Sequence, residues 1–255
     1  MTHLLSDVST MTTRGLRLVS RDVDAMITAV VLPVVILLMF VLVFGGAVDI
    51  GTEYINYVTP GVILLAAGFG ASNTALAVEH DMSSGMVERL RSMPMNAWTV
   101  LSGHVAASLV KNLATTAIVF GVSILLGFRP EASPLEWLAA VGMILLFVGW
   151  ITWLAALVGV LVWSPDAAGG FTFFVMFLPY ISSAFVPVET LPSWLRGFAE
   201  HQPVTPVIET VRGLLAGGGS TVADPAGVAM LAIAWCLGLG LFFAVTAGLA
   251  FRARR

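Results

Sequence analysis

The residues that could do chemistry are concentrated in one segment, EHDMSSGMVERLRSMPMN at residues 79–96. It combines acids, arginines, a serine pair and a proline, while the chain on either side is almost free of charge. The segment has no catalytic or metal-ligand spacing, so its charges favour ion pairs with a protein partner or with lipid headgroups.

Sequence signatures of catalysis are absent from the chain. There is no G-x-x-x-x-G-K-[ST] motif to bind ATP, and the four histidines lie far apart. The single cysteine, Cys236, excludes a disulfide or a cysteine metal site within one chain. No acid or base lies deep in an apolar run, which argues against proton-driven transport. We therefore predict no catalytic residue, metal or cofactor in this chain, and any work it does would draw energy from another subunit.

Composition points to a lipid environment. The chain has 255 residues, of which 58% are hydrophobic and only 11% charged, against about 25% charged in soluble domains. It has no basic block that would bind nucleic acid. A helix needs about 20 apolar residues to cross a bilayer, and five of the six uncharged runs meet that length. The third run, of 17 residues, reaches it if its helix starts nearer Val105, with Lys111 at the inner boundary. The runs cover residues 25–48, 54–78, 112–128, 137–164, 167–188 and 225–251.

These runs predict an all-α integral membrane protein with six transmembrane helices, because the backbone can be satisfied in lipid only by helices or closed barrels. Arginine and lysine near the ends of spans accumulate on the cytoplasmic side. With the N-terminus inside, the inner segments carry eight arginines and the outer segments three. We expect both termini in the cytoplasm.

Two segments outside the spans are amphipathic. Within residues 1–24, apolar side chains share one helical face and Arg14, Arg17 and Arg21 another, which predicts an interfacial helix facing either lipid or a partner. Residues 187–224 predict an extracellular re-entrant helical hairpin before the last span. Its first helix follows Pro192, and its second starts near Thr205 and ends at Gly217. The apolar stripe of the second helix is Val207, Ile208, Val211, Leu214 and Leu215.

Helical spacing of apolar residues also predicts secondary structure within the segment 79–96. Met86, Leu90 and Met93 are spaced i, i+4, i+7, which predicts a short cytosolic helix with one apolar ridge. Ser83, Ser84 or Gly85 could cap its start and Pro94 ends it. Methionines adapt to a partner surface. From the residues alone, a knob that docks on a partner and a loop lying on lipid headgroups are equally favoured.

Several motifs in order resemble those of the permease subunits of type-2 ABC exporters, in particular the daunorubicin-resistance-like branch. That family has an acid at the end of span two and then G-T-x-E-R-L-R-x-x-P. Here Glu79 is followed by GMVERLRSMP at 85–94, and VTPG at 58–61 opens span two. The outer segment has LPSWL at 191–195 and QPVT at 202–205. The chain departs from the pattern at Met86 for threonine, Gln202 for asparagine and His104, where lysine is common.

The resemblance implies one transmembrane domain over residues 1–255, with residues 79–99 as the loop that carries the coupling helix. Two permease chains, identical or sister, would pair with two separate ABC ATPase subunits, which would bind the ATP and Mg²⁺. The location implied is the bacterial inner membrane. The expected ATPase-coupling residues are Glu79, Ser83, Ser84, Gly85, Met86, Glu88, Arg89, Leu90, Arg91, Met93 and Pro94.

The resemblance also implies a substrate pathway between spans two and five of facing chains. Candidate lining residues are Phe69, Asn73, Phe173, Phe177 and Tyr180, although helix packing or lipid contact explains the aromatic stripe equally well. The expected substrate is a hydrophobic or amphipathic small molecule, such as a drug or a lipid-like compound. An ATP-independent carrier, an exporter of a lipid-linked glycan and a membrane anchor for a cytosolic partner remain alternatives.

Overall fold

The computed structural model describes residues 9–17, 23–46, 53–87, 97–216 and 224–254. Helices joined by short turns make up these ranges, and no strand occurs within them. An all-α fold, expected from the uncharged runs, is therefore confirmed for the described chain.

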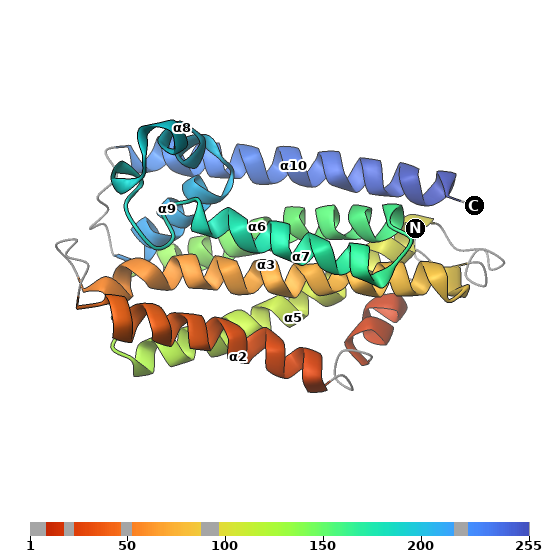
Figure 1. Ribbon diagram of the computed structural model, residues 1–255, viewed down its shortest axis with the longest axis horizontal. Coiled ribbons are helices and arrows are strands. Elements are labelled where there is room, and N and C mark those ends of the chain that lie inside the picture. Colours follow the sequence, from red (N-terminus) through yellow and green to blue (C-terminus); the bar gives the residue numbers. More distant parts are fainter. Residues whose placement is uncertain (1–8, 18–22, 47–52, 88–96, 217–223, 255) are drawn as a thin grey trace.

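The helices that form the body of the molecule lie side by side, and successive ones run in opposite directions (Figure 1). Residues 9–17 form a short helix before them. The long axis is shared by α2 (Val23–Met39) with its π-helical end η1 (Phe40–Phe44), α3 (Tyr54–Ser83), α5 (Ala97–Leu125), α6 (Pro134–Leu161), α7 (Pro165–Tyr180) and α10 (Pro225–Ala253). Between α7 and α10 come η2 (Val188–Thr190), α8 (Ser193–His201) and α9 (Val204–Leu215).

In the described chain, α3, α5, α6 and α10 are long and apolar enough to cross a membrane. At about 1.5 Å per residue, the 30 residues of α3 span about 45 Å, well beyond the roughly 30 Å hydrocarbon core. α2 and α7 coincide with the other two predicted spans but have only 17 and 16 residues. The molecule is a multi-pass membrane protein in which four of the six predicted spans reach full length.

α5 begins earlier than the sequence suggested. The prediction started this span near Val105, but the helix begins at Ala97. Lys111 therefore lies about 21 Å along α5 rather than near its inner end. The uncharged run marks only the second half of this helix because the charge of Lys111 interrupts it in the middle.

α3 lies at the centre of the bundle and packs against α2, α5, α6 and α7. At two helix crossings a glycine, which has no side chain, allows the neighbouring helix to approach closely. A Cβ at Gly70 would lie 1.9 Å from Asn112 Oδ1 on α5, and a Cβ at Gly159 on α6 would lie 2.5 Å from the carbonyl oxygen of Ala75. Small residues thus set the spacing of these helices, as is common in membranes.

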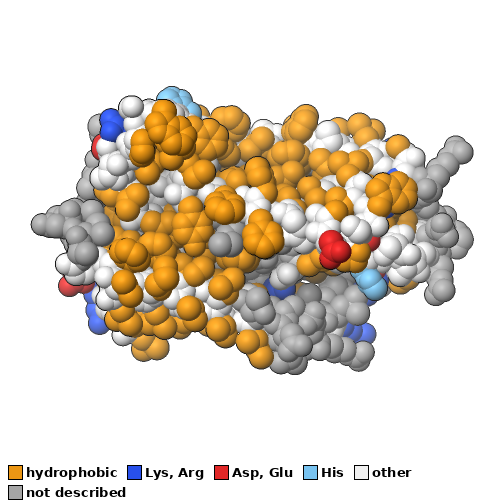
Figure 2. Space-filling view, in the orientation of Figure 1, with side chains coloured by type: hydrophobic (Ala, Val, Ile, Leu, Met, Phe, Trp, Pro, Cys, Tyr) orange, Lys and Arg blue, Asp and Glu red, His pale blue; other side chains and the backbone are white. Residues whose placement is uncertain are grey.

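The outside of the bundle is apolar. Hydrophobic side chains cover most of the face that carries α7, α3 and α2 (Figure 2). α10 is the least buried of the long helices, and exposed residues along it include Leu237, Leu241 and Phe242. Lipid is the solvent that such a surface fits.

The helical hairpin predicted after Pro192 is present as α8 and α9, at the end of the bundle where α3 begins (Figure 1). α9 packs against α6 and α10, and Val207, Ile208 and Val211 of its predicted stripe are fully buried. α8 contributes less to the core, because Trp194 and Phe198 are exposed. Thr205 does not cap α9; its hydroxyl donates instead to the carbonyl of Ala199, 2.5 Å away.

Candidate functional site

The serines and glycine at 83–85 terminate α3. The backbone N–H of Ser84 and the hydroxyl of Ser83 both donate to the carbonyl oxygen of His80, at 2.9 and 3.2 Å. Gly85 follows with φ of +71°, the left-handed conformation that ends many helices and that glycine adopts without strain. Residues 86–87 are helical again. The three residues therefore act first as a stop signal for α3, with both serines exposed.

One buried carboxylate, Asp81, joins three segments at this end of α3. Arg14 donates to both of its oxygens, each at 2.8 Å, and His104 Nε2 on α5 lies 3.1 Å from Oδ2. The hydrogen bond to Asp81 raises the pKa of Arg14 above its ordinary value, which means that the carboxylate stabilises the charged guanidinium. Charge-assisted bidentate pairs of this kind are among the stronger polar contacts in proteins.

The helix of residues 9–17 is seated on α5. A Cβ at Gly103 would lie 2.4 Å from Met11 Cβ, and a Cβ at Gly15 would lie 2.8 Å from Ala107 Cβ. Residues 9–17 are helical, and the rest of the predicted interfacial helix before residue 23 lies outside the described residues. Within residues 9–17, Arg14 donates to Asp81 of α3. The amphipathic pattern could not reveal this partner, because Asp81 lies 67 residues away in the chain.

Besides the three residues at 83–85, the structure describes two of the predicted coupling residues, Glu79 and Met86. Glu79 is only 2% exposed, and Met86 is partly buried against a cluster of the chain's own residues that includes Val87, Leu101 and Phe251. Neither is a freely exposed contact residue, although Met86 was predicted to lie on an outward ridge. The remainder of the predicted ridge and rim lies outside the described residues: Glu88, Arg89, Leu90, Arg91, Met93 and Pro94.

The predicted pathway residues lie on two neighbouring helices, α3 and α7. Phe173 and Phe177 are 67% and 57% exposed on the outside of α7. Phe69 and Asn73 of α3 are partly buried. Tyr180 stacks on Phe185, with ring centroids 4.9 Å apart. One chain thus presents these aromatic groups on its surface, available to lipid or to a second chain.

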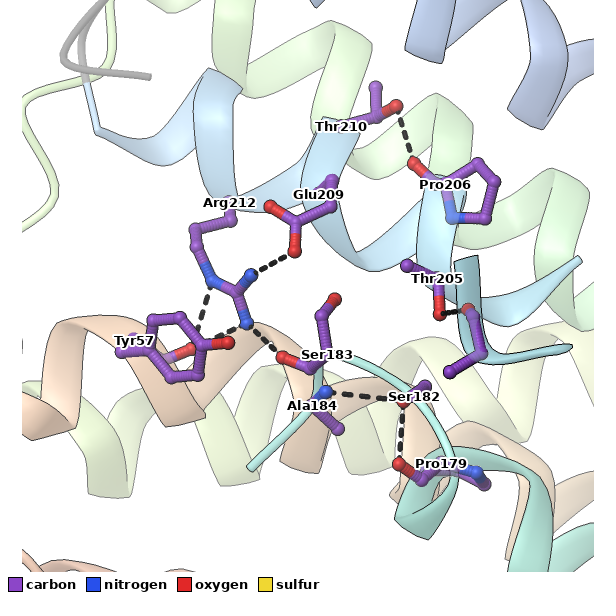
Figure 3. A network of polar contacts seen from close by, with 11 residues as sticks. Tyr57, Pro179, Ser182, Ser183, Ala184, Thr205, Pro206, Glu209, Thr210 and Arg212 are labelled. Atoms are coloured by element: carbon purple, nitrogen blue, oxygen red, sulfur yellow. Dashed lines mark hydrogen bonds and ion pairs between the residues drawn. The ribbon is translucent and has the colours of Figure 1, made fainter. Parts of the chain in front are cut away.

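A polar network at the opposite end of α3 was not predicted. Arg212 of α9 donates to the carbonyl of Tyr57 from Nε and Nη2, at 3.2 and 3.1 Å, and to that of Ser183 at 2.6 Å (Figure 3). Its Nη1 lies 2.6 Å from Glu209, and its guanidinium carbon lies 3.7 Å from the centre of the Tyr57 ring. The arginine ties α9 to α3 and to the turn after α7.

Sequence reasoning placed Arg14 on the polar face of the N-terminal helix and counted Arg212 among the outer arginines, but it gave neither a partner within the chain and gave Asp81 no role. A signal was available for Arg212, which follows Glu209 by three residues on one helical face. No comparable local signal existed for Arg14, Asp81 and His104, since they lie on three separate helices.

Comparison with known proteins gives a consistent result. The family described as ABC-2 type transporter matches residues 6–216. A daunorubicin resistance ABC transporter permease protein, DrrB1 of Streptomyces coeruleorubidus, is 28% identical over 75% of this chain and 69% of its own length. A probable doxorubicin resistance ABC transporter permease protein, DrrC of Mycobacterium tuberculosis, is 26% identical over 91% of this chain and 83% of its own. A putative transport permease, ycf38 of Cyanophora paradoxa, is 24% identical over 74% and 67%.

Proposed function

Because the chain belongs to the ABC-2 type transporter family and is a permease of that kind, we propose that it forms the membrane path of an ATP-driven exporter. Its cargo is a hydrophobic or amphipathic small molecule, drug-like or lipid-like, moved out of the cytoplasm. The observation that carries this proposal is the similarity to permeases named for daunorubicin and doxorubicin resistance.

A separate ABC ATPase supplies the energy, binding ATP and Mg²⁺ that this chain has no P-loop to hold. The proposed contact is the loop of residues 79–99, with Glu88, Arg89 and Arg91 at the rim of a short coupling helix. Two facts support it: α3 ends at Ser83 in a defined glycine turn, and helix begins again at residue 86. ATP-driven closure of the ATPase dimer would move this loop and, with it, α3 and α5.

The proposed topology has six spans, with α2 and α7 as the shorter two, both termini in the cytoplasm and the hairpin α8–α9 re-entrant from outside. The helix of residues 9–17 lies at the same end of the bundle as the end of α10 (Figure 1), which requires an even number of crossings. The excess of arginines at that end favours the cytoplasmic side of a bacterial inner membrane.

A second permease chain, identical or a sister, completes the path. Phe173 and Phe177 on the surface of α7 would face that chain across the pathway, beside Phe69 and Asn73 of α3. Their exposure leaves both side chains accessible to a second chain.

The experiment is reconstitution in proteoliposomes, with daunorubicin as the probe and a candidate ABC ATPase co-expressed with this chain. Co-purification of that ATPase and ATP-dependent daunorubicin movement are expected. A pH gradient that drives movement by this chain alone would instead establish an ATP-independent carrier. ATPase binding without movement of daunorubicin or a fluorescent lipid would favour a polar, glycan-type cargo or a membrane anchor.

The pathway makes a specific prediction. Asn73→Leu and Phe177→Ala are each expected to lower daunorubicin export about tenfold, because removing one aromatic or polar contact costs about 1.5 kcal/mol. The amount of co-purified ATPase should not change. Phe242→Ala is the matched control, since Phe242 is similarly exposed, 58% against 57% for Phe177, but lies on α10. Equal loss in the control, or none in either test variant, would contradict the proposed pathway.

A further inference from the structure

Asp81, Arg14 and His104 form a partly buried ion-pair cluster, called the joint below, at the base of the proposed coupling loop. Asp81 lies two residues before the last residue of α3 and accepts hydrogen bonds from Arg14 at 2.8 Å on both oxygens. On Oδ2 it also faces His104 at 3.1 Å. The carboxylate is 7% exposed, so water competes little for these bonds. Three segments distant in sequence are thereby held at one point.

The packing around the joint is equally close. Helix 9–17 contacts α5 at two levels one turn apart, Met11 on Gly103 and Gly15 on Ala107, where a Cβ on either glycine would come closer than an ordinary contact to the facing Cβ. Beyond the glycine turn, Val87 is buried in the cluster that also contains Val78 of α3, Val100 and Leu101 of α5. The start of the loop is therefore fixed to α5 on one side and to α3 on the other.

We propose that this joint, Asp81 with Arg14 and His104, is a positioning device that transmits movement of the coupling loop. With the joint closed, a displacement of the loop moves the inner ends of α3 and α5 and helix 9–17 as one body. With it open, the same displacement unwinds the last turn of α3, whose helix already ends at Ser83 and Gly85. This inference rests on the proposed coupling to an ATPase.

The first test is Asp81→Asn in the full complex with its ATPase in lipid nanodiscs. We expect ATP hydrolysis in excess of that by the ATPase alone to fall about tenfold, while the yield of co-purified ATPase stays within a factor of about two. Asp166→Asn is the matched control, because Asp166 is an exposed aspartate at the first turn of α7 on the same end of the bundle. Activity in Asp81→Asn equal to that of the control would overturn the proposal.

A covalent replacement of the joint separates positioning from a loss of folding. Gly15→Cys with Ala107→Cys, in a Cys236→Ala background, places two thiols where the Cβ separation is 2.8 Å, about 1 Å short of ordinary disulfide geometry. Added to Asp81→Asn, the oxidised pair should restore most of the lost hydrolysis, and reduction should abolish the rescue. Failure of the formed disulfide to restore activity would show that docking of helix 9–17 is not what Asp81 provides.

The same assay separates this inference from the proposed function. Replacing residues 85–93 by a Gly-Ser linker tests the coupling loop itself. If that linker lowers hydrolysis but Asp81→Asn does not, the joint is overturned and the exporter proposal stands. If the linker leaves hydrolysis unchanged, the proposal that this loop couples the chain to an ATPase is wrong. The proposed role of Asp81, Arg14 and His104 is then wrong as well, because it depends on that coupling.

Discussion

Replacing Arg212 with methionine is expected to lower the midpoint of thermal unfolding by about 6–12 °C, equivalent to about 3 kcal/mol. The side chain is largely buried, and its loss leaves the Glu209 carboxylate without its cation and the carbonyls of Tyr57 and Ser183 without their donor. Methionine keeps most of the aliphatic part of the arginine side chain, so the change in the unfolding midpoint measures the contribution of the guanidinium group. Tryptophan fluorescence of detergent-solubilised protein during heating measures it.

Arg129→Met is the matched control for this prediction. Arg129 lies in the loop between α5 and α6 and donates to the carbonyls of Ile124 and Phe128 from a more exposed position. Its loss should cost less than about 1 kcal/mol. Equal midpoints for the two variants would show that Arg212 does not tie α9 to α3 and the turn after α7.

Gly61→Ala is expected to destabilise the protein by about 1–3 kcal/mol or to prevent its accumulation in the membrane. A Cβ at Gly61 would lie 2.6 Å from Ala184 Cβ and 2.7 Å from both Ala184 Cα and its carbonyl oxygen. Two of these atoms belong to backbone, so they cannot move aside as a flexible side chain would. The fraction of protein that elutes as a single species on size exclusion after a heat step measures the loss.

Gly142→Ala in α6 should stabilise the protein rather than destabilise it. No atom of a neighbouring residue lies within 4 Å of the added Cβ, and alanine favours helix over glycine by up to about 1 kcal/mol. A destabilised Gly142→Ala together with a neutral Gly61→Ala would contradict the packing of α3 on the turn after α7. The pair is informative because the chemical change is identical and only the surroundings differ.

Much of the fold follows from patterns local in sequence. Apolar runs predict the long helices because lipid leaves the backbone no other partners. Ser133 and Glu136 form a capping box at the start of α6, and the stripe Val207, Ile208 and Val211 predicts the buried face of α9. Local patterns fail where polar residues continue a helix beyond the hydrocarbon, as at the start of α5. The lengths of α2 and α7 likewise depend on packing that no single run encodes.

The candidate site is less accessible to sequence reasoning. The motif at 85–94 led to the permease family, and that membership is confirmed. Its hydrophobic spacing also placed Met86 on an outward ridge, whereas Met86 packs against the chain's own inner cluster. The pairing of Asp81 with Arg14 and His104 depends on how three helices meet, and spacing along one helix carries no information about that.

ATP-driven export by the complex whose residues 85–93 are replaced by a Gly-Ser linker tests the central claim most directly. Proteoliposomes would hold this permease, its ATPase and daunorubicin, with the wild-type complex measured in parallel. The predicted result is loss of ATP-dependent daunorubicin movement from a permease that still elutes as a single folded species, although its thermal midpoint falls because the linker also removes the buried Val87. Full transport with the linker in place would contradict the claim that an ATPase powers this chain through the loop after α3.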